Sequence, residues 1–210
     1  MRRIHALALV LLFGLGACSA APATPATTAA PNTSSPAGPT SSASGNPSLS
    51  ASASPSIEPP ANTGPALHGD GYTLTLPEGW KDSTTELKKV QDSVDRGGKN
   101  ATDTKDGFVD LVTVGVQTSP AISFDQFQPA IERQLKAAGS TKIEFKDNVQ
   151  LDGTEALQVW SVSKIADNAH TIQFAAFRSG NLYVVTVSTN LSDAKADTLA
   201  QQVISGWKWA

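Results

Sequence analysis

The chain has 210 residues, of which 40% are hydrophobic and 17% are charged, and its formal net charge is −3. This mildly acidic balance argues against nucleic acid as a partner, because binding to phosphates needs a basic face. The single cysteine excludes a disulfide within the chain and a thiolate metal cluster.

Residues 1–17 are typical of a secretory signal peptide. Two arginines precede an apolar run from Ala6 to Leu15, and two small residues follow that run. The run has about ten residues, whereas a helix that spans a bilayer needs about twenty. We therefore expect a cleaved leader and not a transmembrane helix.

The four residues Leu15-Gly16-Ala17-Cys18 resemble the bacterial lipobox. That resemblance implies that the Cys18 thiol takes a diacylglyceryl group and becomes the new N-terminus. Fatty acids such as palmitate would then hold the protein to the extracytoplasmic face of the cell membrane, since two or more acyl chains give stable anchoring. The alternative is ordinary secretion with an incidental cysteine.

Residues 18–66 combine this cysteine with a predicted disordered linker. From Ser19 to Ala66, 42 of 48 residues are Ala, Ser, Thr, Pro or Gly, and none is aromatic. Such a segment cannot bury enough apolar surface to offset the entropy of ordering it. We expect an extended, solvated tether that carries one globular domain over residues 67–210.

The first half of that domain shows short apolar patterns. Alternation predicts a strand over residues 72–76, and Pro77-Glu78-Gly79 predicts a turn. The next polar stretch suits a short helix carried by Leu87, Val90 and Val94, with a break and a mobile turn at Gly97-Gly98. Residues 108–117 are β-branched and predict a further strand.

The second half predicts two amphipathic helices around a β-meander. Ser123 to Gln126 resembles a capping box, and the helix after it ends at Gly139. Pro129 requires either a kink or a regular helix that begins near Gln128. Strands follow over residues 141–149, 154–165, 170–178 and 182–189, and the last helix runs from Ser192 to Gly206. Sequential alternating strands imply an antiparallel sheet that buries both helices, which is an α+β domain.

A family resemblance rests on these elements. A strand that runs into Leu76-Pro77-Glu78-Gly79-Trp80, a long central helix, a meander and a C-terminal helix resemble the PsbP/Mog1-type α+β sandwich. With the lipobox and the tether, the chain is similar to the LpqN/LpqT-type lipoproteins of actinobacteria. That resemblance implies a non-enzymatic module that binds or steadies partners in the cell envelope, and it supplies no catalytic residues.

The sequence contains no recognisable catalytic or metal-binding motif. We expect His68 and His170 to be surface histidines near turns, because neither is near a nucleophile elbow. The mature domain has too few His and Cys ligands for zinc. The aspartates at 92, 95, 103, 106 and 110 lack the spacing of a calcium loop, so we expect a solvated acidic loop. We therefore expect no cofactor, no metal and no enzymatic activity.

The four tryptophans are candidates for the core or for a binding surface. Trp80 follows a turn and is expected to plug the core, and Trp160 faces either the helices or solvent. For Trp207 and Trp209 we expect core packing, with an exposed aromatic patch as the alternative.

Three functional hypotheses follow in order of preference. The first is a membrane-anchored binding or accessory module of the cell envelope, with an envelope protein or lipid as its partner. The second is a carrier of a lipid or a small hydrophobic ligand, held between helices and sheet. The third is a hydrolase that uses His68, His170 or the acidic residues.

Overall fold

The computed structural model describes residues 61–103, 107–119, 122–163 and 169–210. The predicted signal peptide, Cys18 and almost all of the predicted linker lie outside these residues. The first described residues already belong to the fold, since the backbone N–H of Gly64 donates to the carbonyl of Leu76 at 2.9 Å and the Asn62 side chain donates to the carbonyl of Gln202 at 2.7 Å.

The largest element is a seven-stranded sheet in which every neighbouring pair is antiparallel. Val114 pairs with Val185 and Ile172 pairs with Val187 in its central strands, where β-branched side chains pack well on a pleated surface. In spatial order the strands are β3 (Trp80–Asp82), β4 (Val94–Asn100), β5 (Leu111–Thr118), β9 (Asn181–Thr189), β8 (His170–Arg178), β7 (Thr154–Ser163) and β6 (Ser140–Leu151).

A second, three-stranded sheet joins the two ends of the domain. Its members are β1 (Ala66–Gly69), β2 (Tyr72–Thr75) and β10 (Trp207–Trp209), with β2 in the middle. Trp207 pairs with Leu74 and Trp209 pairs with Tyr72, so the last residues of the chain form a strand. The alternating pattern predicts only β2 of these three strands. β10 has three residues, and β1, although as long as β2, has a single buried side chain, that of Leu67.

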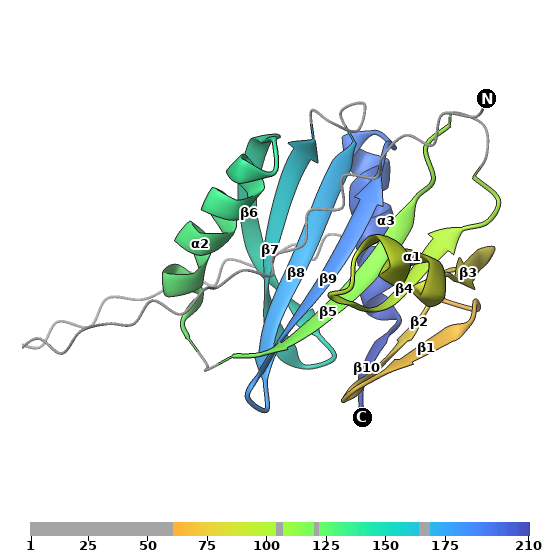
Figure 1. Cartoon of the computed structure of the whole chain (residues 1–210), viewed down its shortest axis with the longest axis horizontal. Helices are drawn as coiled ribbons and strands as arrows, with labels where there is room; N and C mark the ends of the chain where they lie inside the picture. Colours follow the sequence, from red (N-terminus) through yellow and green to blue (C-terminus); the bar gives the residue numbers. More distant parts are fainter. Residues whose placement is uncertain (1–60, 104–106, 120–121, 164–168) are drawn as a thin grey trace, which may run out of the picture. The chain divides into compact units, whose positions relative to one another are not determined.

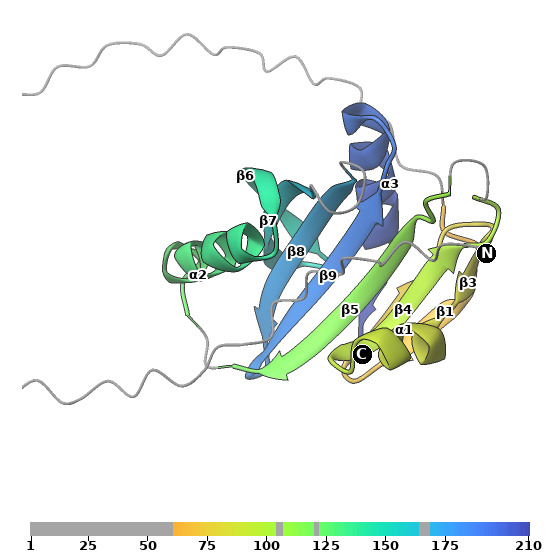
Figure 2. The ribbon, with the colours of Figure 1, turned by 45° about the horizontal axis from the view of Figure 1, so that its top comes forward.

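The described residues contain three helices: α1 (Thr84–Val90), α2 (Phe124–Ala137) and α3 (Asp193–Ser205). Helices α2 and α3 cover opposite faces of the seven-stranded sheet (Figures 1 and 2). Phe127, Ile131 and Leu135 of α2 pack on one face, and Ala196 and Val203 of α3 belong to the cluster on the other. The predicted α+β class, an antiparallel sheet flanked by helices, is confirmed.

The capping box of α2 is confirmed. The Ser123 hydroxyl accepts from the backbone N–H of Gln126 and the Gln126 side chain accepts from the backbone N–H of Ser123, each at 3.4 Å. Pro129 lies inside a helix that begins at Phe124. Gly139 follows the helix with φ 83°, a left-handed conformation that glycine adopts without a steric penalty.

The prediction of a break at Gly97-Gly98 is wrong. Both glycines lie within β4, and Val94 begins that strand instead of extending the helix. A Cβ atom on Gly97 would lie 2.5 Å from Leu87 Cδ1, and one on Gly98 would lie 2.5 Å from Leu76 Cδ1. The glycines are therefore explained by the close approach of two leucines and not by a turn.

Tyr72 connects the two sheets. Its ring stacks on Trp207 with centroids 4.3 Å apart and planes at 3°, and its hydroxyl donates to Asp95 Oδ2 on β4 at 2.8 Å. Burial, together with the nearby Asp95 carboxylate, raises the pKa of Tyr72 far above its usual value. The phenol therefore stays protonated and remains a donor to Asp95.

The C-terminal tryptophans pack as expected. Trp207 is 1% exposed, and Trp209 is partly buried with its ring 5.0 Å from that of Trp207. The Trp209 backbone N–H donates to Asp152 Oδ2 at 3.0 Å, and Lys208 Nζ lies 2.8 Å from Asp152 Oδ1. These contacts fix β10 to the β6–β7 turn.

Replacement of Trp207 by alanine should lower the free energy of unfolding by about 3–5 kcal/mol, because it removes a fully buried ring and leaves a cavity beside Tyr72. Chemical denaturation followed by circular dichroism would measure this loss. Val90→Ala is the matched control, since Val90 is 67% exposed and its loss should change stability by less than about 0.5 kcal/mol. Similar effects of the two changes would contradict the structure.

Asp152→Asn should destabilise the protein in a pH-dependent way. The hydrogen bond from Lys208 and then that from the Trp209 backbone lower the pKa of Asp152. A lowered folded-state pKa gives stability that is present above the unfolded value of about 3.9 and is lost as the pH falls through the folded value. The stability difference between wild type and variant should therefore shrink from pH 7 to pH 3. A difference that grows in acid would contradict this assignment.

Candidate functional site

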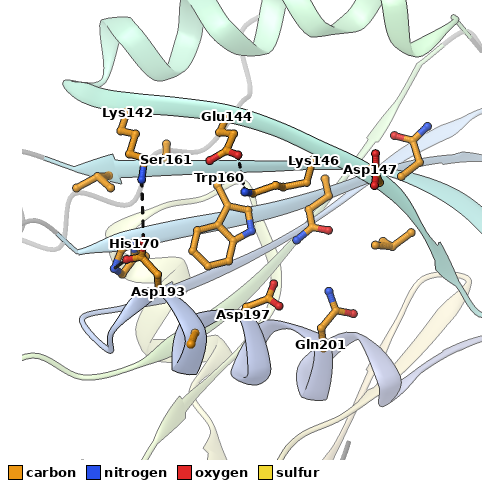
Figure 3. A pocket seen from close by; sticks show the side chains of 15 residues that line it. Lys142, Glu144, Lys146, Asp147, Trp160, Ser161, His170, Asp193, Asp197 and Gln201 are labelled. Atoms are coloured by element: carbon orange, nitrogen blue, oxygen red, sulfur yellow. Dashed lines mark hydrogen bonds and ion pairs between the residues drawn. The ribbon is translucent and has the colours of Figure 1, made fainter. Parts of the chain in front are cut away.

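A groove of about 510 Å³ lies between α3 and the β6–β7 edge of the large sheet. This volume is in the range of small-molecule sites. Only four of its 15 lining residues are apolar, namely Val149, Trp160, Val162 and Ala194. Figure 3 shows β6 along one side of the groove, α3 along the other and the Trp160 ring between them.

The α3 wall consists of Asp193, Ala194, Asp197 and Gln201. The three polar residues are four positions apart, so they share one face of the helix. The helix buries a different face, with Ala196, Ala200, Val203 and Ile204 in the core. The wall therefore carries two carboxylates and one carboxamide.

The β6 wall consists of Lys142, Glu144, Lys146, Asp147, Asn148 and Val149. The first three occupy every second position of the strand and so project from one face of it. Lys146 Nζ lies 2.5 Å from Glu144 Oε1 and 5.8 Å from the centroid of the Trp160 ring. Lys142 Nζ reaches across the groove to within 3.9 Å of Asp193 Oδ2. Both of those side chains are about two-thirds exposed or more, so this ion pair contributes little to stability.

The floor of the groove consists of Gln158, Trp160 and Val162 of β7. Gln158 is 4% exposed, and its carboxamide makes no hydrogen bond within the described residues. The Trp160 Nε1 atom is buried and also lacks a partner there. Because an unpaired buried polar group costs free energy, the floor has hydrogen-bonding capacity that the described fold does not use.

His170 lies at one end of the groove. Its Nε2 atom is 3.4 Å from Asp193 Oδ1, and its ring packs against Trp160 with centroids 5.8 Å apart. Its side chain is 13% exposed, and its Nδ1 atom is buried without a hydrogen-bond partner. The expectation of a surface histidine is therefore wrong for His170, which is largely buried beside the indole.

The other residues considered for chemistry do not gather at this groove. His68 lies on β1, where its Nδ1 atom is 3.2 Å from Thr73 Oγ1. Asp95 is bound to Tyr72 and Arg96, and Asp110 is 3% exposed, so neither belongs to a solvated acidic loop as predicted. Asp106 lies outside the described residues.

A hydroxyl group and several possible metal ligands line the groove. Ser161 lines it, but the hydroxyl of Ser161 interacts with Ser140 at 3.4 Å and has no contact with His170 in the described part of the chain. Within residues 61–103, 107–119, 122–163 and 169–210, no three His, Cys, Asp or Glu side chains are grouped as a metal site would require. The same residues contain no helix that is long and apolar enough to span a bilayer.

Sequence reasoning missed Gln158, Asp193 and Asp197. The repeat of polar residues at positions 193, 197 and 201 was visible as one face of the last helix. The sequence did not show that this face lies opposite the lysines of β6, because that depends on how α3 crosses the sheet.

Comparison with known proteins gives similarities of fold. The cyanobacterial PsbP (CyanoP) of Synechocystis has a TM-score of 0.49 and 18% identity over 73% of this chain and 99% of its own. The Ran-binding protein Mog1p of Saccharomyces cerevisiae has a TM-score of 0.46 and 18% identity over 68% of this chain and 92% of its own.

LpqN of Mycobacterium tuberculosis, which is involved in cell envelope biogenesis, has a TM-score of 0.48 and 12% identity over 69% of this chain and 88% of its own. No family model and no curated protein sequence matches the chain. The solved structures are of the types that the order of elements resembled. At this level of similarity, the function has to be argued from the residues of this chain.

If the polar residues of the floor are present for binding, they should contribute little to the free energy of unfolding. Gln158→Leu should leave the free energy of unfolding unchanged or raise it by up to about 1 kcal/mol, because it replaces an unpaired buried amide by an apolar group of similar size. Gln201→Met on the α3 wall is the control, with an expected change within about 0.5 kcal/mol. Thermal and chemical denaturation would measure both changes. A loss above about 1 kcal/mol for Gln158→Leu would show that its amide is a structural partner.

Proposed function

We propose that this protein is an exported, lipid-anchored binding module of the cell envelope, and that the groove between α3 and β6–β7 is its binding site. The observation that carries the proposal is a groove with a polar floor, in which the Gln158 side chain is 4% exposed and makes no hydrogen bond within the described residues. A binding partner would satisfy the carboxamide of Gln158.

The anchor supports the location. The lipobox at residues 15–18 follows a short apolar leader, and the tether after it has almost no residues that could form a core. A lipid on Cys18 would keep the domain beside the membrane while the tether lets it move away from the surface.

An accessory role fits the groove better than the carrier hypothesis does. A pocket for an acyl chain needs a predominantly apolar lining, whereas most side chains around this groove are charged or polar. The spaces between the helices and the sheet are filled by two packed clusters of buried side chains. A non-enzymatic role is part of the proposal, since the groove offers contacts for binding and no arranged nucleophile and base.

The anchor can be tested directly. In the native host, the wild-type chain should incorporate labelled palmitate and sediment with membranes, whereas Cys18→Ser should lose both properties because the thiol is the site of lipid attachment. A variant with Ser19→Ala should behave as wild type. Unlabelled wild-type protein that is released into the medium would refute the anchor.

The binding role can be tested by complementation. A deletion strain should show altered sensitivity to detergents that perturb the envelope, and wild type and Val90→Ala should restore it. Gln158→Leu and Trp160→Ala should be produced at normal levels and fail to restore it. A deletion without any envelope phenotype, or full rescue by both groove variants, would contradict the proposal.

A further inference from the structure

We propose that the groove binds a short zwitterionic peptide, with its free amino group on the α3 wall and its carboxylate on the β6 wall. This inference rests on the proposed binding function and names the ligand class for the same site. Three features carry it: two carboxylates on α3 opposite Lys142 of β6, a carboxamide without a partner in the floor, and an indole ring between the walls (Figure 3).

The α3 wall offers negative charge that the fold has not neutralised. Asp193 has only loose contacts, with His170 at 3.4 Å and Lys142 at 3.9 Å. Asp197 makes no ion pair within the described part of the chain. An ammonium group placed here would gain a charge-assisted hydrogen bond, which is about twice as strong as a neutral one.

The β6 wall offers one available positive charge. Glu144 and Lys146 are paired with each other, so their charges cancel. Lys142 has only its distant contact with Asp193 and is 66% exposed, so it can turn toward a ligand at little cost. The carboxylate of the ligand would therefore pair with Lys142, whose ammonium group extends from β6 toward α3.

The floor matches a peptide group. The Gln158 carboxamide has both donors and an acceptor, as a peptide bond does, so the two groups can form a pair of hydrogen bonds. The face of the Trp160 ring provides an apolar surface for an aliphatic side chain.

Other ligand classes use fewer of these groups. The lining has two lysines against the four carboxylates of Glu144, Asp147, Asp193 and Asp197, so a phosphate or another ligand with net negative charge would be repelled, whereas a zwitterion brings no net charge. A simple cation would satisfy Asp197 and leave Gln158 unpaired. A neutral polyol would satisfy Gln158 and gain nothing from the charged walls.

The test uses the full chain from residue 18 with Cys18→Ser, labelled with ¹⁵N and titrated with L-alanyl-L-alanine. We expect chemical-shift changes confined to the α3 wall, the β6 wall and the floor. The N-acetylated dipeptide and the dipeptide amide should each bind at least about tenfold more weakly, because each lacks one of the two charges.

Matched variants locate the amino group. Asp197→Asn should weaken binding of the free dipeptide by about tenfold and leave the N-acetylated form unchanged. Asp125→Asn, at the start of α2 on the other face of the sheet, should change neither. Any of three results would overturn the proposal: equal affinity for the three peptide forms, tighter binding of maltose than of the dipeptide, or no chemical-shift changes at groove residues.

The two proposals fail separately. If no peptide binds while the groove variants still fail to complement the deletion strain, the ligand class is wrong and the binding function stands. If no peptide binds and both groove variants complement fully, both proposals are wrong.

Discussion

The structure depends on the burial of Tyr72 between the two sheets. Its ring lies against Trp207 from the last strand, and its hydroxyl is held by Asp95 from the large sheet. One side chain thus links the first strands, the last strand and the main sheet. Because α3 is followed directly by Gly206 and β10, this link also fixes the C-terminal end of α3.

The groove and the core differ in composition. In the core, apolar side chains fill the space and most backbone groups are paired within the sheets and helices, which is the low-energy arrangement. In the groove, the floor carries Gln158, which is 4% exposed, and the buried Nε1 atom of Trp160 has no partner in the described chain. An indole nitrogen without a partner also occurs in the core, at Trp207. The feature particular to the groove is therefore the gathering of charged and polar side chains around one cavity.

Sequence patterns were sufficient for the elements with a clear period. The capping box at Ser123, the hydrophobic stripe of α2 and the alternating strands after it were all present in the chain where the structure has them.

Sequence patterns failed to predict structure where tertiary contacts determine it. Gly97 and Gly98 indicated a turn, yet they are the small residues that let Leu87 and Leu76 approach a strand. Trp207 and Trp209 form a strand because β2 offers an edge, which no local pattern shows. The groove was missed for the same reason, since its β6 wall ends at Val149, its α3 wall begins at Asp193, and the two come together only when α3 packs across the sheet.

The two edge strands of the large sheet also affect how copies of the protein behave at high local concentration. One border strand, β3, has three residues, and the other, β6, changes register with β7 at two places and carries alternating lysines and glutamate. Short, irregular and charged borders are poor templates for a strand from another molecule. Many copies at high local concentration would therefore remain separate molecules. A flat, apolar edge strand would instead promote fibril formation.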